Sequence, residues 1–400
     1  MSRYVSSICC FLLATSVCIS FGCNDNVLPD TVKLGIVTSL TGDKAEFGEA
    51  QQHGYEIAAE EINAAGGILG IPVELIYEDD CGQPNTAITA VEKLITEDEV
   101  PVVLGAYSSS CTLTASQAAD QQATTFICPC GADDQITQRG LPWVFRINAP
   151  ASAYAATSFD FLDDIMELET VAIVFENTDF GTSEAQAAKS ICQDRGVQVL
   201  SYDSYEAGAQ DFGPLLASIK SKEPQVLFAV SYIADAILLT RQARELELDL
   251  EAFVGGGAGF TMPQYVESLG DDAEGVFTVS QWSSSVNWPG AGEFSDKHES
   301  KYGYRPEYHA AETYASTYVI ADAIERAASL DKEKIRQALR ETNLNTIFGP
   351  VQFRNVENEH GDYVQQNEHQ MLMLQVQEGQ LVIVWPEDLA ETSPLSPGAK

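Results

Sequence analysis

Short apolar runs alternate with amphipathic stretches along most of the chain. The apolar run 32–39 precedes residues 45–65, where apolar positions recur at helical spacing before Gly66 and Gly67. The same alternation predicts further strands at 73–77, 102–106 and 125–129, with helices at 86–96 and 113–122. This order is typical of a parallel sheet covered by helices on both faces.

The second half of the chain repeats this order. It predicts strands at 170–175, 197–202, 225–230 and 251–254, and helices at 183–194, 212–221 and 234–246. The near-constant offset between corresponding strands indicates two α/β lobes of one topology. Beyond them, the pattern predicts a strand at 276–279, helices at 309–329 and 333–341, and β structure at 352–353, 370–375 and 381–384. These segments have no lobe of their own, so we expect them to complete the two lobes.

Composition and charge narrow the functional classes. The chain has 400 residues, 45% of them apolar, which fits two globular domains. The formal net charge of −37 excludes general electrostatic binding of a nucleic-acid backbone and disfavours an anionic membrane surface. We interpret the acidity as a solubility property. The polar segment 386–400 contains three prolines, and we expect it to be disordered.

The first 23 residues have the pattern of an export signal. Arg3 precedes a short apolar run, and Gly22 and Cys23 are followed by polar residues. Cys23 resembles a bacterial lipoprotein cleavage site and is a lipidation candidate, with an uncleaved anchor as the alternative. No later segment is apolar enough to span a bilayer.

Five cysteines follow this leader, and an exported protein meets oxidising conditions, so one disulfide is compatible with the count. The pair Cys128 and Cys130 lacks the spacing of a zinc knuckle, and no histidine pair lies nearby. We therefore predict no metal site and no cofactor.

Ligands of open parallel sheets bind beyond the carboxyl ends of the strands. Two such lobes facing each other form a cleft, lined here by the loops 40–48, 107–110, 130–134, 176–181, 231–232 and 255–260. Ser108, Ser109 and Ser110 lie just before a predicted helix, where hydroxyls and free N–H groups favour an anion such as a carboxylate. The alternative is simple helix capping.

Three loop-tip aromatic residues, Phe47, Phe180 and Tyr232, suit the walls of an apolar or aromatic ligand site, although aromatic residues in loops more often pack in the core or between lobes. We find no phosphate-binding loop, zinc-protease or serine-hydrolase motif, and the five histidines show no paired ligand spacing. His309 is interpreted as a structural or cleft residue. The sequence therefore predicts a protein that is not an enzyme.

Several motifs in order carry a resemblance to a known family. They are KLGIVTSLTGDKAEFGEAQQHGYEIAAEEINAAGG from Lys33, GAYSSS at 105–110, TQRG at 137–140, NTDFG at 177–181 and YHAAETYASTYVIADAIERA at 308–327. The chain resembles the periplasmic branched-chain amino-acid-binding family, the type I solute-binding proteins of ABC importers.

The resemblance implies a monomeric two-lobed receptor that closes on a small solute and presents it to a membrane permease. It implies three crossings between lobes, which we place near 149–152, 280–283 and 348–356. The N-terminal lobe then comprises 30–150 and 281–350, the C-terminal lobe 151–280 and 351–386, with a flexible tail at 387–400. A sensor that binds the same kind of ligand but signals to a membrane partner is the alternative function.

The resemblance also implies roles for individual residues. The loop that begins at Tyr107 binds the ligand's α-carboxylate, with Ser109 or Ser110 the strongest candidates. Cys130 and Gly131 match positions that contribute backbone groups. Ala132 stands where family members often have threonine, and Phe47 and Phe180 match aromatic positions around the ligand.

Two departures from the family pattern concern specificity and disulfide bonding. Gly257 occupies the position of the acid that holds the ligand's ammonium group, so either Asp235, Asp179 or Glu46 replaces that acid or the ligand lacks an α-amino group. An amide, a keto acid or an aromatic carboxylate fits the second case. Cys81 matches one partner of the family's disulfide and Cys111 lies a few residues past the other, which predicts a Cys81–Cys111 bond.

Overall fold

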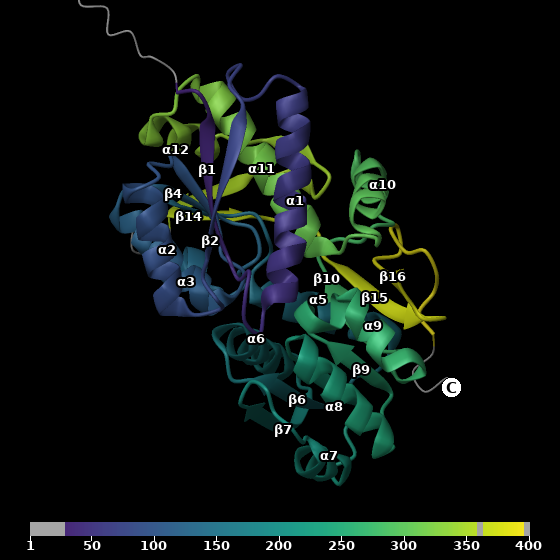
Figure 1. The fold of residues 1–400 in the computed structure, drawn as a ribbon. Coiled ribbons are helices and arrows are strands. Elements are labelled where there is room, and N and C mark those ends of the chain that lie inside the picture. The colour runs from purple at the N-terminus through teal and green to yellow at the C-terminus, as the bar shows by residue number, and fades with distance from the viewer. Residues whose placement is uncertain (1–28, 358–362, 396–400) are drawn as a thin grey trace, which may run out of the picture.

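The structure is a computed structural model that describes residues 29–357 and 363–395. Within these residues, two seven-stranded sheets lie one above the other, each in its own lobe (Figure 1). The N-terminal lobe has the strand order β13 (Phe353–Glu357), β14 (Tyr363–Asn367), β5 (Val144–Arg146), β4 (Thr125–Cys128), β3 (Val102–Gly105), β1 (Val32–Thr38), β2 (Val73–Asp79). The C-terminal lobe has the order β16 (Gln380–Trp385), β15 (Leu372–Gln377), β10 (Phe277–Ser280), β9 (Ala252–Gly255), β8 (Val226–Val230), β6 (Thr170–Glu176), β7 (Gln198–Tyr205).

The two sheets share one topology. In both, the first strand of the lobe pairs in parallel with the second and third, for example Val32 opposite Val73 and Gly35 opposite Val103. The prediction of two similar α/β lobes is confirmed. The sheets are mixed rather than purely parallel, because β13 runs antiparallel to β14 and β15 runs antiparallel to both β10 and β16.

Helices cover both faces of the N-terminal sheet because alternate strand residues point to opposite sides. Leu34 and Ile36 pack with α1 and α11, whereas Val37 and Val103 pack with α2 and α3. The helices of this lobe are α1 (Ala45–Ala64), α2 (Pro84–Thr96), α3 (Ser109–Gln121), α4 (Gln135–Gln138), α10 (Ala291–Tyr302), α11 (Tyr308–Ala327) and α12 (Lys332–Arg340). The short strands β11 (Leu344–Thr346) and β12 (Gly349–Val351) pair beside them.

The C-terminal sheet is covered in the same way. Val171 and Ile173 pack with α5 and α6, whereas Ala172 and Val174 pack with α7 and α8. The helices of this lobe are α5 (Ala151–Ile165), α6 (Asp179–Arg195), α7 (Gly213–Lys220), α8 (Ile233–Glu245), η1 (Ala258–Thr261), α9 (Pro263–Leu269) and η2 (Gly270–Ala273). The apolar pattern did not single out α5.

Two helices begin four residues earlier than the pattern predicts. Helix α3 begins at Ser109 and α6 at Asp179, because the hydroxyls of Ser108 and Thr178 accept hydrogen bonds from the N–H groups of Cys111 and Gly181. Both helix N-termini therefore reach the edge of the cleft between the lobes.

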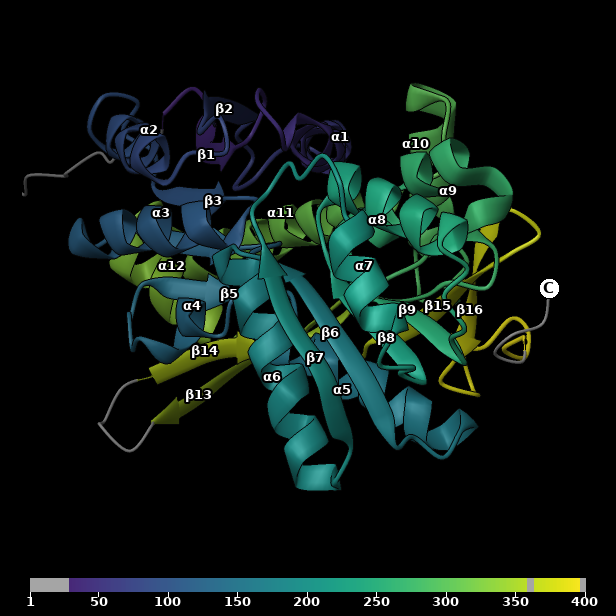
Figure 2. The ribbon, with the colours of Figure 1, turned by 90° about the horizontal axis from the view of Figure 1, so that it is seen from below.

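The chain crosses between lobes before α5, after β10 and after β14. The third crossing, expected near 348–356, instead lies between β14 and β15, at 368–371. Figure 2 shows the yellow strands β13 and β14 in one lobe and β15 and β16 in the other. The assignment of 351–386 to the C-terminal lobe was therefore wrong for 353–357 and 363–367. Side-chain amides of Gln365 and Asn367 hold β14 in place, donating to the carbonyl oxygens of Val144 (2.6 Å) and Ile147 (3.0 Å).

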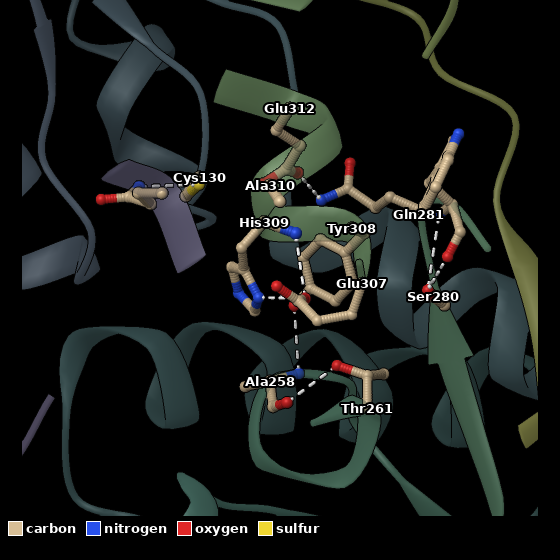
Figure 3. A network of polar contacts seen from close by, with 12 residues as sticks. Cys130, Ala258, Thr261, Ser280, Gln281, Glu307, Tyr308, His309, Ala310 and Glu312 are labelled. Carbon is tan, nitrogen blue, oxygen red and sulfur yellow. Dashed lines mark hydrogen bonds and ion pairs between the residues drawn. The ribbon is translucent and has the colours of Figure 1, made fainter. Parts of the chain in front are cut away.

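All three crossings meet at Gln281. Its Oε1 accepts from the N–H of Ala149 in the first crossing at 2.6 Å, and its carbonyl oxygen lies 2.6 Å from Nε2 of His369 in the third. Its Nε2 donates to Glu312 on α11 at 2.6 Å, a contact visible in Figure 3. A single buried residue, through its side chain and its backbone carbonyl, thus links the segments that connect the lobes.

The expected disorder of the tail is wrong for 386–395. Oε1 of Glu391 accepts from the N–H of Ile383 at 2.9 Å and from the hydroxyl of Ser285 at 2.6 Å, and Leu389 packs against the core. The predicted leader, including Cys23, lies outside the described residues. Among the helices of the described chain, none is long and apolar enough to cross a membrane.

Candidate functional site

A small cavity lies where the two lobes meet. The N-terminal lobe supplies Tyr107, Ser109, Cys130, Ala132, Tyr308 and His309 to its wall, and the C-terminal lobe supplies Tyr154, Phe180, Tyr232 and Ala258. The cavity measures about 20 Å³, which is room for about one water molecule. The lobes are therefore closed on each other, and a larger ligand requires them to separate.

The three predicted serines in the loop from β3 to α3 have different roles. Ser108 is the helix cap, since its hydroxyl accepts from the N–H of Cys111 at 3.3 Å. The Ser109 hydroxyl accepts from the N–H groups of Ala132 (3.2 Å) and Asp133 (3.0 Å), so its own hydrogen is left to donate. Ser109 lies in the first turn of α3, whose free N–H groups and positive dipole end favour an anion. Ser110 is partly exposed and does not line the cavity.

Two buried side chains fix the loop that follows β4. Arg146 is 1% exposed, and its Nη1 donates to the carbonyl oxygens of Ala132 (3.1 Å) and Asp133 (2.6 Å). Nδ2 of Asn148 donates to the carbonyl oxygen of Cys130 at 2.9 Å. Gly131 packs against Thr112 behind the wall and does not line the cavity. The backbone of this loop is thus held by satisfied hydrogen bonds on the side away from the cavity.

Aromatic rings from both lobes form most of the remaining wall. Tyr107 stacks on Phe47 with ring centroids 4.4 Å apart, so Phe47 supports the wall from behind instead of lining the cavity. From the other lobe, the ring of Tyr232 lies 5.8 Å from that of Phe47 and 5.7 Å from that of Phe180. The three predicted loop-tip aromatics therefore converge at the interface between the lobes, and Phe180 and Tyr232 reach the cavity.

The first turn of α11 adds residues that sequence reasoning did not single out as ligand contacts. His309 Nδ1 lies 2.5 Å from Oε2 of Glu307, which also accepts from the His309 N–H at 2.9 Å (Figure 3). The Tyr308 hydroxyl accepts from the N–H of Ala258 at 3.1 Å, which joins the two lobes. A glutamate before two aromatic residues at the start of a helix was the available signal. Tyr154 was missed because it lies on α5, which was not predicted.

None of the cavity-lining residues in the described chain carries a carboxylate. The φ angle of Gly257 is +74°, and a Cβ there would lie 2.9 Å from the Tyr154 ring, so an acid does not fit at this position. Of the acids considered as replacements, Glu46 is exposed. Asp235 accepts from the N–H of Gly208 at 2.9 Å outside the cavity. Asp179 lies in a separate hollow at the mouth of the cleft, beside Asp133 and Asp134.

The predicted Cys81–Cys111 disulfide is absent, and both cysteines are free. Cys111 is buried in the first turn of α3, whereas Cys81 is exposed and its sulfur accepts from the Thr41 hydroxyl at 3.4 Å. Burial raises the pKa of the Cys111 thiol to about 12. Within the described residues, no group of three or more His, Cys, Asp or Glu side chains forms a metal site.

Comparisons with known proteins agree with this geometry. A family model described as periplasmic binding protein matches residues 31–380. The chain is 29% identical over 378 residues to a Leu/Ile/Val-binding protein homolog 7 of Brucella melitensis, covering 90% of this chain and 92% of that protein.

Two solved structures illustrate the similarity in fold. The branched-chain amino acid transporter substrate binding protein LivJ from Streptococcus pneumoniae, in complex with isoleucine, has a TM-score of 0.79 and 25% identity, covering 88% of this chain and 97% of that chain. An ABC transporter solute binding protein from Rhodopseudomonas palustris, in complex with 3,4-dihydroxy benzoic acid, has a TM-score of 0.79 and 19% identity, covering 92% and 99%. The second likeness concerns the fold alone.

Proposed function

The chain belongs to the periplasmic binding protein family, and on that premise we propose that it is the solute-binding component of an ABC importer. It captures a small amino acid, or a related carboxylate or amide, in the cleft between its lobes and delivers it to a permease in the inner membrane. The curated relatives are named as binding proteins, in agreement with the prediction that the chain is not an enzyme.

One observation carries the proposal: a cavity walled by both lobes, with the N-terminus of α3 and the Ser109 hydroxyl at its edge. A carboxylate at this point accepts hydrogen bonds from the hydroxyl and from helix N–H groups, at the positive end of the helix dipole. The predominantly aromatic wall then covers the remainder of the solute.

Closure of the lobes supplies the mechanism. A solute that contacts both lobes is bound more tightly in the closed state, so it shifts the open–closed equilibrium toward closure. The contact between Tyr308 and Ala258 forms only when the lobes meet, and Gln281 holds the three connecting segments together during the motion.

Delivery to a permease requires an extracytoplasmic location. The proposal assigns residues 1–23 as the export signal and Cys23 as the lipid-attachment site of a membrane-anchored form. The functional unit is a monomer, with a permease as its only macromolecular partner. No observation favours the sensor alternative.

The test is mass spectrometry of small molecules released by denaturing protein that was purified gently from its native host. The proposal predicts release of an amino acid, a carboxylate or an amide. If the protein is empty, a thermal-shift panel of the same classes follows, since a ligand that binds only the folded state raises its stability. A panel in which no such compound shifts the melting temperature contradicts the proposal.

A further inference from the structure

A lysine of the N-terminal lobe lies against an aromatic ring of the C-terminal lobe. Lys44 immediately precedes α1, and its Nζ lies 4.7 Å from the centroid of the Tyr232 ring, which immediately precedes α8. A cation over the face of an aromatic ring is attracted by the ring quadrupole. Because the two residues belong to different lobes, this contact forms only when the lobes meet.

The loop that carries Lys44 is fixed within its own lobe. At the end of β2, Asp79 accepts hydrogen bonds from the N–H of Leu40 at 2.9 Å and from the hydroxyl of Thr41 at 2.6 Å. The aliphatic stem of Lys44 passes 3.8 Å from the point that a Cβ at Gly82 would occupy. The ammonium group is therefore directed toward the other lobe by a loop whose backbone is held in place.

The Lys44 ammonium group has no competing partner in the N-terminal lobe. Within residues 29–357 and 363–395, it makes no hydrogen bond and no ion pair, and its specific contact is the ring of Tyr232. Lys93 of the same lobe differs in this respect, since it pairs with Glu78. Separation of the lobes therefore costs Lys44 its contact and offers it only water in exchange.

Two buried acids of the C-terminal lobe lie next to this contact. Glu176 is 2% exposed and Asp235 is 5% exposed. One carboxyl oxygen of Glu176 accepts from the N–H of Tyr232 at 3.3 Å, and the other has no hydrogen-bond partner. Burial raises the pKa of Glu176 to about 7 and the pKa of Asp235 above its usual value, and the positive charge of Lys44 opposes both shifts. Lys44 thus faces negative charge as well as the ring.

We propose that Lys44 is a latch between the lobes: it holds the closed state through Tyr232 and the neighbouring acids and thereby sets the rate at which the solute leaves. The inference rests on the proposed function and adds a determinant of solute release to it. Lys44 does not line the cavity, so it is a positioning residue that acts on closure and not on recognition of the solute.

The role as a latch predicts which rate constant changes. An interaction that exists only in the closed state stabilises that state relative to the open one. The solute enters while the lobes are open and leaves after they reopen, so loss of the latch should accelerate dissociation and leave association nearly unchanged.

The experiment measures both rate constants by stopped-flow fluorescence at pH 8, where Glu176 is mostly ionised because its pKa is about 7. The probe is whichever of L-leucine, L-glutamate, benzoate and benzamide raises the melting temperature of the wild type most. We expect Lys44→Met to dissociate about 3–30-fold faster, the range expected for loss of a cation–π contact, with association changed less than about 2-fold.

Two variants separate the latch from a general effect of the substitution. Lys44→Arg keeps the cation and should restore dissociation to within about 3-fold of the wild type. Lys93→Met is the matched control and should leave both rate constants unchanged, because its ion pair with Glu78 lies within the N-terminal lobe. Raising the salt concentration from about 20 to about 500 mM should accelerate dissociation more in the wild type than in Lys44→Met. Equal dissociation rates of the wild type and Lys44→Met would overturn the inference, as would an effect confined to association.

Failure of the proposed function has a different signature, since in that case no probe and no other acid or amide binds the wild type. The latch is then tested on the solute-free protein by small-angle X-ray scattering at low salt. We expect a smaller radius of gyration for the wild type than for Lys44→Met, because only the wild type retains the contact that favours closure. Identical radii would overturn the inference.

Discussion

The loops after the fourth strand of each lobe occupy equivalent places and differ in how their buried polar groups are satisfied. In the N-terminal lobe, Arg146 and Asn148 donate to the carbonyl oxygens of the loop after β4. In the C-terminal lobe, the carboxyl of Glu184 on α6 lies against Gly256 in the loop after β9, and neither of its oxygens has a hydrogen-bond partner. The buried polar groups around the first loop are therefore satisfied, whereas the buried carboxyl beside the second loop is not.

This difference predicts opposite consequences of removing the buried charged group on each side. A cation whose hydrogen bonds are all made stabilises its loop, so its loss leaves carbonyl groups unsatisfied. A carboxyl without partners contributes a desolvation cost to the solute-free protein, so its loss relieves that cost. Topology is shared between the lobes, but the energetic role of the equivalent loop is not.

The largest effect is expected for Arg146→Met. Its guanidinium also donates to Thr137 and Gln366, so the substitution leaves several buried acceptors unpaired. We expect the free energy of unfolding to fall by about 3–5 kcal/mol, measured by urea denaturation. Arg195→Ala, which removes an exposed pair of salt bridges, should cost less than about 1 kcal/mol. Equal losses in the two variants would contradict the assigned role of Arg146.

The pH dependence of the free energy of unfolding tests the buried acid Glu176, which belongs to the C-terminal lobe. Burial raises the pKa of Glu176 to about 7, above its usual value of 4.5. The protonated form is therefore favoured in the folded state, and its contribution is complete below pH 4.5 and lost as pH rises through about 7. As pH rises from 4.5 through about 7, the wild type should therefore lose roughly 3 kcal/mol of unfolding free energy relative to Glu176→Gln, which does not titrate. A difference independent of pH would exclude this titration.

Solute affinity tests the N-terminal side of the cleft. Ser109→Ala combined with Ser110→Ala should weaken binding of a carboxylate solute by about 1–3 kcal/mol, because the carboxylate loses a hydroxyl donor. The single variants separate the two residues, and Ser110→Ala alone is expected to change little, since Ser110 does not line the cavity. Unchanged calorimetric affinity of the double variant would remove the carboxylate from this loop.

The smallest predicted change in stability is that of Glu184→Leu, and we expect it to be opposite in sign to that of Arg146→Met. Glu184→Leu should raise the free energy of unfolding of the solute-free protein by about 1–2 kcal/mol at pH 7, since an apolar group replaces an unpartnered carboxyl. The measurement is the same urea denaturation as for Arg146→Met. A destabilised Glu184→Leu variant would show that the carboxyl is satisfied in the folded state and would erase the contrast between the two loops.

Apolar periodicity predicted β1–β4, β6–β10, β15 and β16, and the central strands among them, such as β3 and β8, are buried along their whole length. It failed for β14, whose Gln365, Gln366 and Asn367 read as a polar loop. Their amides hydrogen-bond to backbone carbonyls such as those of Val144 and Asn148, so the strand is held by polar groups that no hydropathy pattern reveals. The ordered segment 386–395 escaped prediction for a similar reason, since its anchor Glu391 binds residues distant in sequence.

The candidate site shows the same limit. Ser109, Cys130, Phe180 and Tyr232 were found because strand ends and a family resemblance place them at the cleft. The relation between Glu184 and Gly256 was not, because the residues lie 72 positions apart and meet only in three dimensions.

Small-angle X-ray scattering with and without the solute released from native protein tests the central claim most directly. The account predicts a larger radius of gyration for the solute-free protein, and a scattering curve at saturation that matches the closed structure in Figure 1. A radius of gyration that stays the same when bound solute is confirmed by calorimetry would contradict capture by closure of the two lobes.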